Sequence, residues 1–206
     1  TIHGGLKFFS GSTNIFLGDS AGYYNTTGDL NTVLGYWSGG ENTTGGRNVF
    51  LGAYAGGSNT AGNRNVFVGL SSGINNTDGN ENTSLGAAAF YTNQTGSYNT
   101  VLGRSAGFSN LTGERNVFLG YKAGYNELGS DKLYIENSDA NLNSALIYGE
   151  FNNDYLKLNA LTSVRDALIL EPRSSAPASP VKGMMYFDST VNKLKVFDGT
   201  IWRSLW

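Results

Sequence analysis

The chain has 206 residues, with 29 Gly, 3 Pro, no Cys and a formal net charge of −2. The absence of Cys excludes disulfides, and a slightly acidic chain with 15% charged residues offers no basic surface for nucleic acid. No apolar run approaches the ~18 residues of a membrane span, so no membrane insertion is expected. A single His, His3, excludes Cys/His nucleophiles and transition-metal sites, and no cofactor is expected.

A tandem repeat of 17 residues runs from Asn14 to Gly124 without any change of register. Each of the seven units opens with Asn, and a Gly follows four positions later. The opening residues are Asn14, Asn31, Asn48, Asn65, Asn82, Asn99 and Asn116, and the glycines are Gly18, Gly35, Gly52, Gly69, Gly86, Gly103 and Gly120. Self-similarity at a short fixed period indicates a solenoid.

Two further glycines recur in each unit. Position nine is Gly in every unit except the fifth, where Phe90 replaces it, and position fifteen is Gly until Ser130. The same spacing continues backwards to Gly5 and Gly11. The sequence therefore predicts the tail of an eighth coil at the start of the chain, and an upstream fibre segment as a partner.

The composition of one unit predicts its local structure. Seventeen residues with three glycines do not support a helix, because isolated helices need about 12–15 residues and Gly weakens them. Short strands joined by Gly turns fit better, so each unit is predicted to be one coil of an all-β, parallel β-solenoid or β-roll. The Asn residues at positions one and twelve then form either amide ladders between coils or turn caps, and both alternatives stay open.

Positions two to four of each unit are mostly apolar, as in Val49-Phe50-Leu51. Neighbouring strand residues face opposite sides, so such a strand is apolar on both faces. One coil has a single interior, and the second face needs another surface. The economical partner is another copy of the chain around a rotation axis, and a homotrimer is predicted.

The repeat weakens after Gly124, and the chain is divided into four parts. Residues 1–130 are assigned to the solenoid, 131–171 to a β-rich cap, 172–181 to a stiff linker that holds all three prolines, and 182–206 to a C-terminal β-meander tip. In the cap, strands are predicted at Lys132–Glu136, Ala145–Phe151, Tyr155–Leu158 and Ala167–Glu171.

Binding residues are sought at the variable positions, where aromatic side chains suit sugar or protein surfaces. The candidates are Tyr36, Trp37, Tyr54, Tyr91 and Trp202. The preferred alternative is that the aromatics of the repeat fill grooves between protomers. Position seventeen holds a possible basic stripe for anionic glycans, or a solvated edge, made of Arg47, Arg64, Arg115 and Lys132.

Catalysis and ice binding are the less favoured alternatives. A glycosidase needs two carboxylates, which Glu136, Asp139, Glu150 and Asp154 could supply, but no spacing singles out a pair, so no enzyme is predicted. The Thr columns of the repeat suggest an ice-binding array, although other residues interrupt them.

Two resemblances rest on these motifs. Units such as Asn-Thr-Val-Leu-Gly at 31–35 and 99–103 resemble the head repeats of trimeric autotransporter adhesins, whose period is shorter. The repeat, the segment 132–151 and the ending 180–202 are similar to bacteriophage tail fibres and fibre proteins of Bacteroidota-type bacteria. These resemblances imply a trimeric fibre, on a virion or a cell surface, that binds a host-cell glycan or protein. A polysaccharide-degrading tailspike and a bacterial adhesin filament are the alternatives.

Overall fold

The computed structural model describes residues 13–163 and 168–206. The chain divides into two compact units, Thr1–Ala160 and Leu161–Trp206, and each is described by itself. The predicted eighth coil with Gly5 and Gly11 lies outside the described residues. The secondary structure of the described part is almost entirely β, with one short 3-10 helix.

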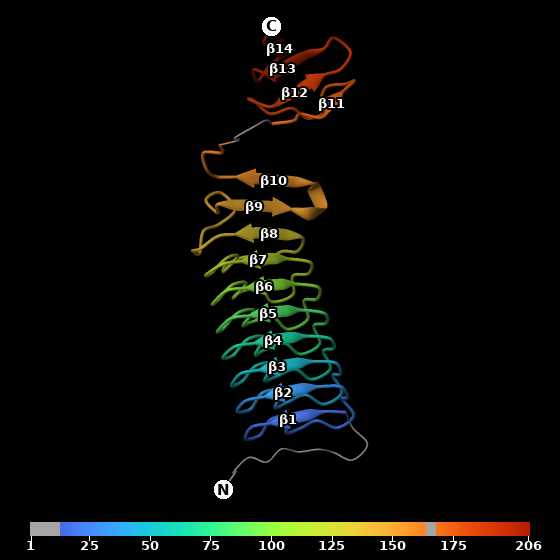
Figure 1. Ribbon diagram of the computed structural model, residues 1–206, viewed down its shortest axis with the longest axis vertical. Helices are drawn as coiled ribbons and strands as arrows, with labels where there is room; N and C mark the ends of the chain where they lie inside the picture. Colours follow the sequence, from blue (N-terminus) through green and yellow to red (C-terminus); the bar gives the residue numbers. More distant parts are fainter. Residues whose placement is uncertain (1–12, 164–167) are drawn as a thin grey trace. The chain divides into compact units, whose positions relative to one another are not determined.

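The first unit is a β-solenoid in which each coil contributes one strand to a ten-stranded sheet, stacked in chain order (Figure 1). Strands β1 to β8 pair in parallel, and from β1 to β7 each residue lies opposite the residue 17 positions later, as Val49 lies opposite Val66. The strands are β1 (Ile15–Leu17), β2 (Thr32–Leu34), β3 (Val49–Leu51), β4 (Val66–Val68), β5 (Thr83–Leu85), β6 (Thr100–Leu102), β7 (Val117–Leu119), β8 (Lys132–Ile135), β9 (Ile147–Glu150) and β10 (Tyr155–Leu158). The predicted β-solenoid of 17-residue coils is confirmed.

The core of the solenoid is a column of position-three side chains. In each three-residue strand the middle residue is buried and its two neighbours are exposed or half-buried, because side chains alternate along a strand. The column consists of Phe16, Val33, Phe50, Phe67, Ser84, Val101 and Phe118. A single chain therefore covers only one of the two apolar faces of its sheet.

The Asn residues of position twelve form an amide ladder and cap turns at the same time. The Asn59 Nδ2 donates to Asn42 Oδ1 at 2.7 Å and also to the Gly62 carbonyl at 3.0 Å. The ladder runs from Asn25 to Asn93, where every step is 2.7 Å. Both alternatives left open by the sequence are thus present in one column.

The Asn residues of position one are bonded mainly to backbone. The Asn65 N–H donates to Asn48 Oδ1 at 2.9 Å, and Asn48 Nδ2 crosses the coil to the Gly62 carbonyl at 2.9 Å. Asn48 is fully buried. These bonds join each coil to the next and brace its interior, so the invariant Asn is explained by structure alone.

The glycine of position five is required by conformation and by close approach. Gly52 has φ +137°, and a Cβ on it would lie 2.6 Å from the carbonyl oxygen of Gly69 in the next coil. Left-handed φ values favour Gly because it has no Cβ. Each of these glycines lets the next coil stack directly upon it.

Phe90, which replaces Gly at position nine, fills the core of the fifth coil from the opposite side. Its side chain is fully buried in a cluster with Val101 and Phe118, although its φ is +55°. The position-three residue of that coil is the small Ser84, whose Oγ receives a 2.9 Å hydrogen bond from Ser72 Oγ. The exception in the glycine pattern is therefore compensated within the same coil.

The solenoid ends in a change of strand direction. Strand β8 is parallel to β7 with Val117 opposite Leu133, an offset of 16 residues, whereas β9 and β10 are antiparallel. The helix η1 (Phe151–Asn153) joins β9 to β10. Three of the predicted cap strands are thus present: β10 has the predicted ends, and β8 and β9 are shorter than predicted.

The second unit contains a four-stranded sheet of β11 (Pro172–Arg173), β12 (Met185–Asp188), β13 (Lys193–Phe197) and β14 (Trp202–Ser204). Strand β12 is antiparallel to β13, and β13 to β14.

Two sequence predictions for this region are wrong. Pro172 and Arg173 begin the predicted linker but pair in parallel with β12, because an edge strand tolerates a Pro that lacks an N–H. The predicted strand Ala167–Glu171 is absent over 168–171, and Ala167 lies outside the described residues.

Candidate functional site

The predicted binding aromatics do not form one site. Tyr36 and Tyr54 lie on adjacent coils with ring centroids 5.3 Å apart at 81°, and both side chains are exposed. Trp37 lies parallel to Tyr23 at 6.0 Å, over Gly40, where a side chain would collide with the indole. The Tyr36–Tyr54 pair is the one contact among the five candidates within the described residues.

Tyr91 belongs to a stack of three rings along position ten. Its ring lies 4.9 Å from Phe108, which lies 5.0 Å from Tyr125, and both pairs are within 10° of parallel. Trp202 is in the second unit, where its ring packs edge-on against Tyr186 at 4.8 Å. Tyr91 and Trp202 are therefore engaged with neighbours of their own chain.

Acidic residues interrupt the predicted basic stripe, at Glu81 and Asp131. Arg64 lies 3.3 Å from Glu81, and Arg115 lies 2.7 Å from Asp131. Lys132 was placed in this stripe on the assumption of a 17-residue step, but the 16-residue offset puts Asp131 there instead. Lys132 belongs to β8 and pairs with Glu150, so that prediction is wrong.

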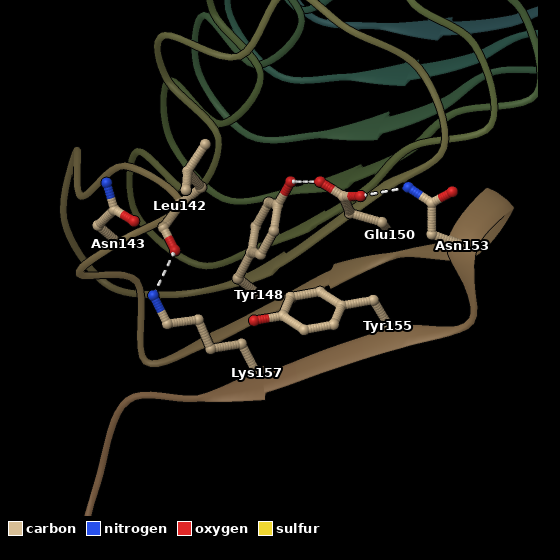
Figure 2. A pocket seen from close by; sticks show the side chains of 7 residues that line it. All are labelled: Leu142, Asn143, Tyr148, Glu150, Asn153, Tyr155 and Lys157. Carbon is tan, nitrogen blue, oxygen red and sulfur yellow. Dashed lines mark hydrogen bonds between the residues drawn. The ribbon is translucent and has the colours of Figure 1, made fainter. Parts of the chain in front are cut away.

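A pocket lies at the end of the solenoid, beside β9 and β10 (Figure 2). We call it the cap pocket, and it is lined by Leu142, Asn143, Tyr148, Glu150, Asn153, Tyr155 and Lys157. Its volume is about 410 Å³, in the size range of small-molecule sites. The loop before β9 supplies Leu142 and Asn143, and the other residues come from the β9–β10 hairpin.

The register of the hairpin explains why four of these side chains share one face. Tyr155 lies opposite Glu150, and Lys157 lies opposite Tyr148. Residues two apart in a strand point to the same side. Tyr148 continues the core column, with its ring 5.0 Å from that of Tyr134. No further coil covers this face in the first unit, and the end of the core is therefore open as a pocket.

Glu150 is a fixed anion at the back of the cap pocket. Its carboxylate accepts a hydrogen bond from the Tyr148 hydroxyl at 2.6 Å and another from Asn153 Nδ2, and Lys132 Nζ lies 3.2 Å away. These three donors, the Tyr148 hydroxyl first, lower the pKa of Glu150 to about 2. Burial and the Glu150 carboxylate raise the pKa of Tyr148 above its usual value.

Two side chains at the mouth of the pocket keep unused hydrogen-bonding capacity. Tyr155 is 49% exposed and its ring makes an edge contact with Tyr148, while its hydroxyl has no hydrogen-bond partner among the described residues. Lys157 Nζ makes one long hydrogen bond of 3.4 Å, to the Leu142 carbonyl, and an ammonium has three donors. Figure 2 shows the Lys157 ammonium directed at the Leu142 carbonyl and the Tyr155 hydroxyl without a hydrogen bond to the residues drawn.

The other carboxylates that the sequence singled out have structural partners or no special arrangement. Glu136 accepts hydrogen bonds from the N–H groups of Asn137 and Leu146 at 2.6 and 2.7 Å, and Asp139 lies 3.4 Å from Lys122. Asp154 has a left-handed backbone at the end of η1. In the described ranges, no three His, Asp or Glu residues are grouped to hold a metal, and no helix is long and apolar enough to cross a membrane.

The cap pocket was missed because its residues come from a loop and a hairpin whose pairing was not predicted. One signal was present: Tyr148-x-Glu150 and Tyr155-x-Lys157 each place polar and aromatic side chains on one face of a strand. Comparisons with known proteins identify no relative of this chain. No family model, no curated protein and no solved structure matches the chain.

Proposed function

We propose that the chain is a segment of a homotrimeric, non-enzymatic fibre that binds a host-cell surface, on a virion or on the outside of a cell. The observation that carries this proposal is the outer face of the solenoid sheet. Positions two and four of each coil point away from the core, and position four is Leu or Val in all seven coils. That column is Leu17, Leu34, Leu51, Val68, Leu85, Leu102 and Leu119.

The outer face is apolar and open to solvent in a single chain. Leu102 is 46% exposed, and several of its counterparts are exposed to a similar extent. Seven coils at a spacing of about 4.8 Å make this face about 30 Å long. A contiguous exposed apolar face of this kind is typical of an interface between proteins.

The same face continues into the cap. Leu133 and Ile135 of β8 point outwards, and so do Leu156 and Leu158 of β10, because they alternate with the pocket residues. Leu156 is 60% exposed. The apolar strip thus runs along all ten strands of the sheet, on the side opposite the cap pocket.

The periodicity of the strip favours another copy of this chain as its partner. A surface that repeats at every coil is best matched by a surface with the same spacing, and parallel copies around one axis meet this condition. Three copies are proposed from the resemblance to trimeric fibres. In such an assembly the Asn ladders make the solenoid a stiff spacer.

The remaining parts of the proposal concern recognition. The second unit is proposed to be a C-terminal β-meander tip that contacts a host glycan or protein, and an upstream fibre segment is proposed to precede the solenoid. The absence of an enzymatic role is supported by Glu150, which stays ionised at neutral pH because Tyr148, Asn153 and Lys132 donate to it, so that it does not suit a general acid.

The native mass of the chain, measured by light scattering during size-exclusion chromatography, tests the proposal. A value near three times the chain mass of 22.0 kDa is expected. A monomer would overturn the trimer, since its exposed strip would then have no partner. Release of oligosaccharide from host capsule or lipopolysaccharide would overturn the non-enzymatic assignment.

A further inference from the structure

We propose that the cap pocket binds one ring of a neutral saccharide. This inference rests on the proposed surface-binding function and assigns its ligand class to a specific place in the fold.

The shape and lining of the pocket suit a sugar ring. A pyranose presents an apolar C–H face and a rim of hydroxyl groups. Tyr148 and Tyr155 form two aromatic walls whose rings are 6.4 Å apart at 63°, so the half-exposed Tyr155 can offer its ring to the apolar face. The volume of about 410 Å³ leaves room for one ring together with bridging water.

The polar groups of the pocket suit the hydroxyl rim. Lys157 has unused donors, the Tyr155 hydroxyl can donate or accept, and Asn143 adds an exposed amide from the loop. Glu150 is held in place by Tyr148, Asn153 and Lys132, so its oxygens need no rearrangement when a ligand arrives. Preorganised polar groups reduce the entropic cost of binding.

The charge of the lining favours a neutral sugar over an anionic one. Glu150 and Lys157 are the charged residues that line the pocket, and their charges cancel. Glu127, which accepts a 2.8 Å hydrogen bond from the Tyr134 hydroxyl in the layer behind, adds negative charge nearby. Because Lys132 beside Glu150 offsets this charge, the site has no net positive charge to pair with the carboxylate of a uronic or sialic acid, and a neutral hexose needs none.

The location of the pocket is compatible with the proposed trimer. Tyr155 and Lys157 lie on the face of β10 opposite Leu156 and Leu158, which belong to the apolar strip. Packing of copies through that strip leaves the cap pocket uncovered. Three pockets on one fibre would raise the avidity of individually weak sugar contacts.

The test is saturation-transfer NMR and calorimetry on the full chain. The neutral probes are methyl glycosides of glucose, galactose, mannose and N-acetylglucosamine, and the anionic probes are N-acetylneuraminic and glucuronic acid. Binding of at least one neutral glycoside is expected. No binding by any neutral probe, or tighter binding of an anionic one, would overturn the inference.

Variants then place the site. Tyr155→Ala should weaken neutral-sugar binding at least tenfold, whereas Tyr121→Ala, which removes an exposed ring elsewhere on the solenoid, should leave it unchanged. Lys157→Gln preserves the hairpin fold and should also weaken binding. Unchanged affinity in both pocket variants would overturn the assignment.

The oligomeric state separates this inference from the proposed function. A trimer that attaches to cells but binds no sugar would overturn the pocket alone. A monomer that binds a neutral glycoside through Tyr155 would overturn the trimeric fibre and support the pocket.

Discussion

The ring of Phe90 occupies the core space that the small side chain of Ser84 leaves empty in the same coil. In the third coil, a Cβ on the corresponding Gly56 would lie 2.8 Å from the ring of Phe50. Phe90 avoids such a collision because its own coil has Ser84 and the next coil has Val101 at position three. The fifth coil thus takes its core ring from position nine instead of position three, whereas the second and sixth coils have Val33 and Val101 in the column.

A double-mutant cycle on this pair should show strong coupling. Phe90→Gly empties a fully buried site and should cost about 3 kcal/mol, and Ser84→Phe should overpack the core by about 1–3 kcal/mol. The combination Ser84→Phe with Phe90→Gly restores the pattern of the third coil and should be more stable than either single variant. Denaturant midpoints at fixed protein concentration measure the cycle, and additive losses would contradict it.

A charge introduced into the apolar strip should change the oligomeric state. The same charge at an equally exposed leucine outside the strip should not. Leu102→Glu places a carboxylate in the middle of the strip and should convert the proposed trimer to monomer, because the charge would be buried without a partner. Leu111→Glu is the matched control, since Leu111 is 42% exposed but lies outside the strip. Light scattering reports both masses, and equal behaviour of the two variants would count against the interface.

Loss of one rung of the position-twelve ladder should be costly. Asn59→Ala removes three hydrogen bonds of a fully buried side chain and leaves Asn42 Oδ1 without its donor, although the Gly62 carbonyl still accepts from Asn48 Nδ2. A loss of about 3 kcal/mol in the free energy of unfolding is expected. The exposed Asn126→Ala should change it by less than about 0.5 kcal/mol. Similar losses in the free energy of unfolding in both variants would contradict a stabilising role of the ladder.

Two glycine substitutions should differ according to their conformation. Gly52→Ala combines φ +137° with a Cβ that would contact the Gly69 carbonyl, and it should destabilise the fold by more than about 2 kcal/mol. Gly57→Ala meets its nearest atom at 3.3 Å with no positive φ, at a position where other coils carry Tyr or Phe. Gly57→Ala should therefore change the free energy of unfolding by less than about 1 kcal/mol. Thermal unfolding followed by circular dichroism compares the two.

Stability should fall at acidic pH in part through Glu150. Its pKa of about 2 in the folded chain is below the usual value, chiefly because the Tyr148 hydroxyl donates to it. A lowered pKa gives stability that is fully present above the unfolded pKa of about 4.3 and is lost as pH falls towards 2. The advantage of the wild type over Glu150→Gln in unfolding midpoint should therefore shrink between pH 6 and pH 2. An advantage that does not change with pH would contradict this linkage.

The solenoid was predictable because the residues that repeat, Asn and Gly, have specific hydrogen-bonding and backbone requirements. The Asn and Gly columns gave the coil length, and the observed pairing of Val49 with Val66 follows it. The orientation of the strands was not predictable, since Val49, Phe50 and Leu51 are all apolar and alternation gives no contrast. The structure shows that the middle residue points inwards.

The end of the repeat was less predictable because small changes in spacing have large effects there. One residue fewer in the last coil puts Asp131, not Lys132, beside Arg115. The cap pocket depends on the pairing of Tyr155 with Glu150, which joins strands that the sequence predicted separately. This pairing is local, but the connection Phe151-Asn-Asn-Asp154 contains no Asn-Gly or Asp-Gly pair that would have predicted a hairpin.

Identical bonding between coils makes the length of the solenoid adjustable in whole steps. The Asn48 N–H donates to Asn31 Oδ1 as the Asn65 N–H donates to Asn48 Oδ1, so one 17-residue unit can be added or removed while these bonds between coils keep equivalent partners. The length of the solenoid can thus change during evolution in steps of about 4.8 Å without a new fold.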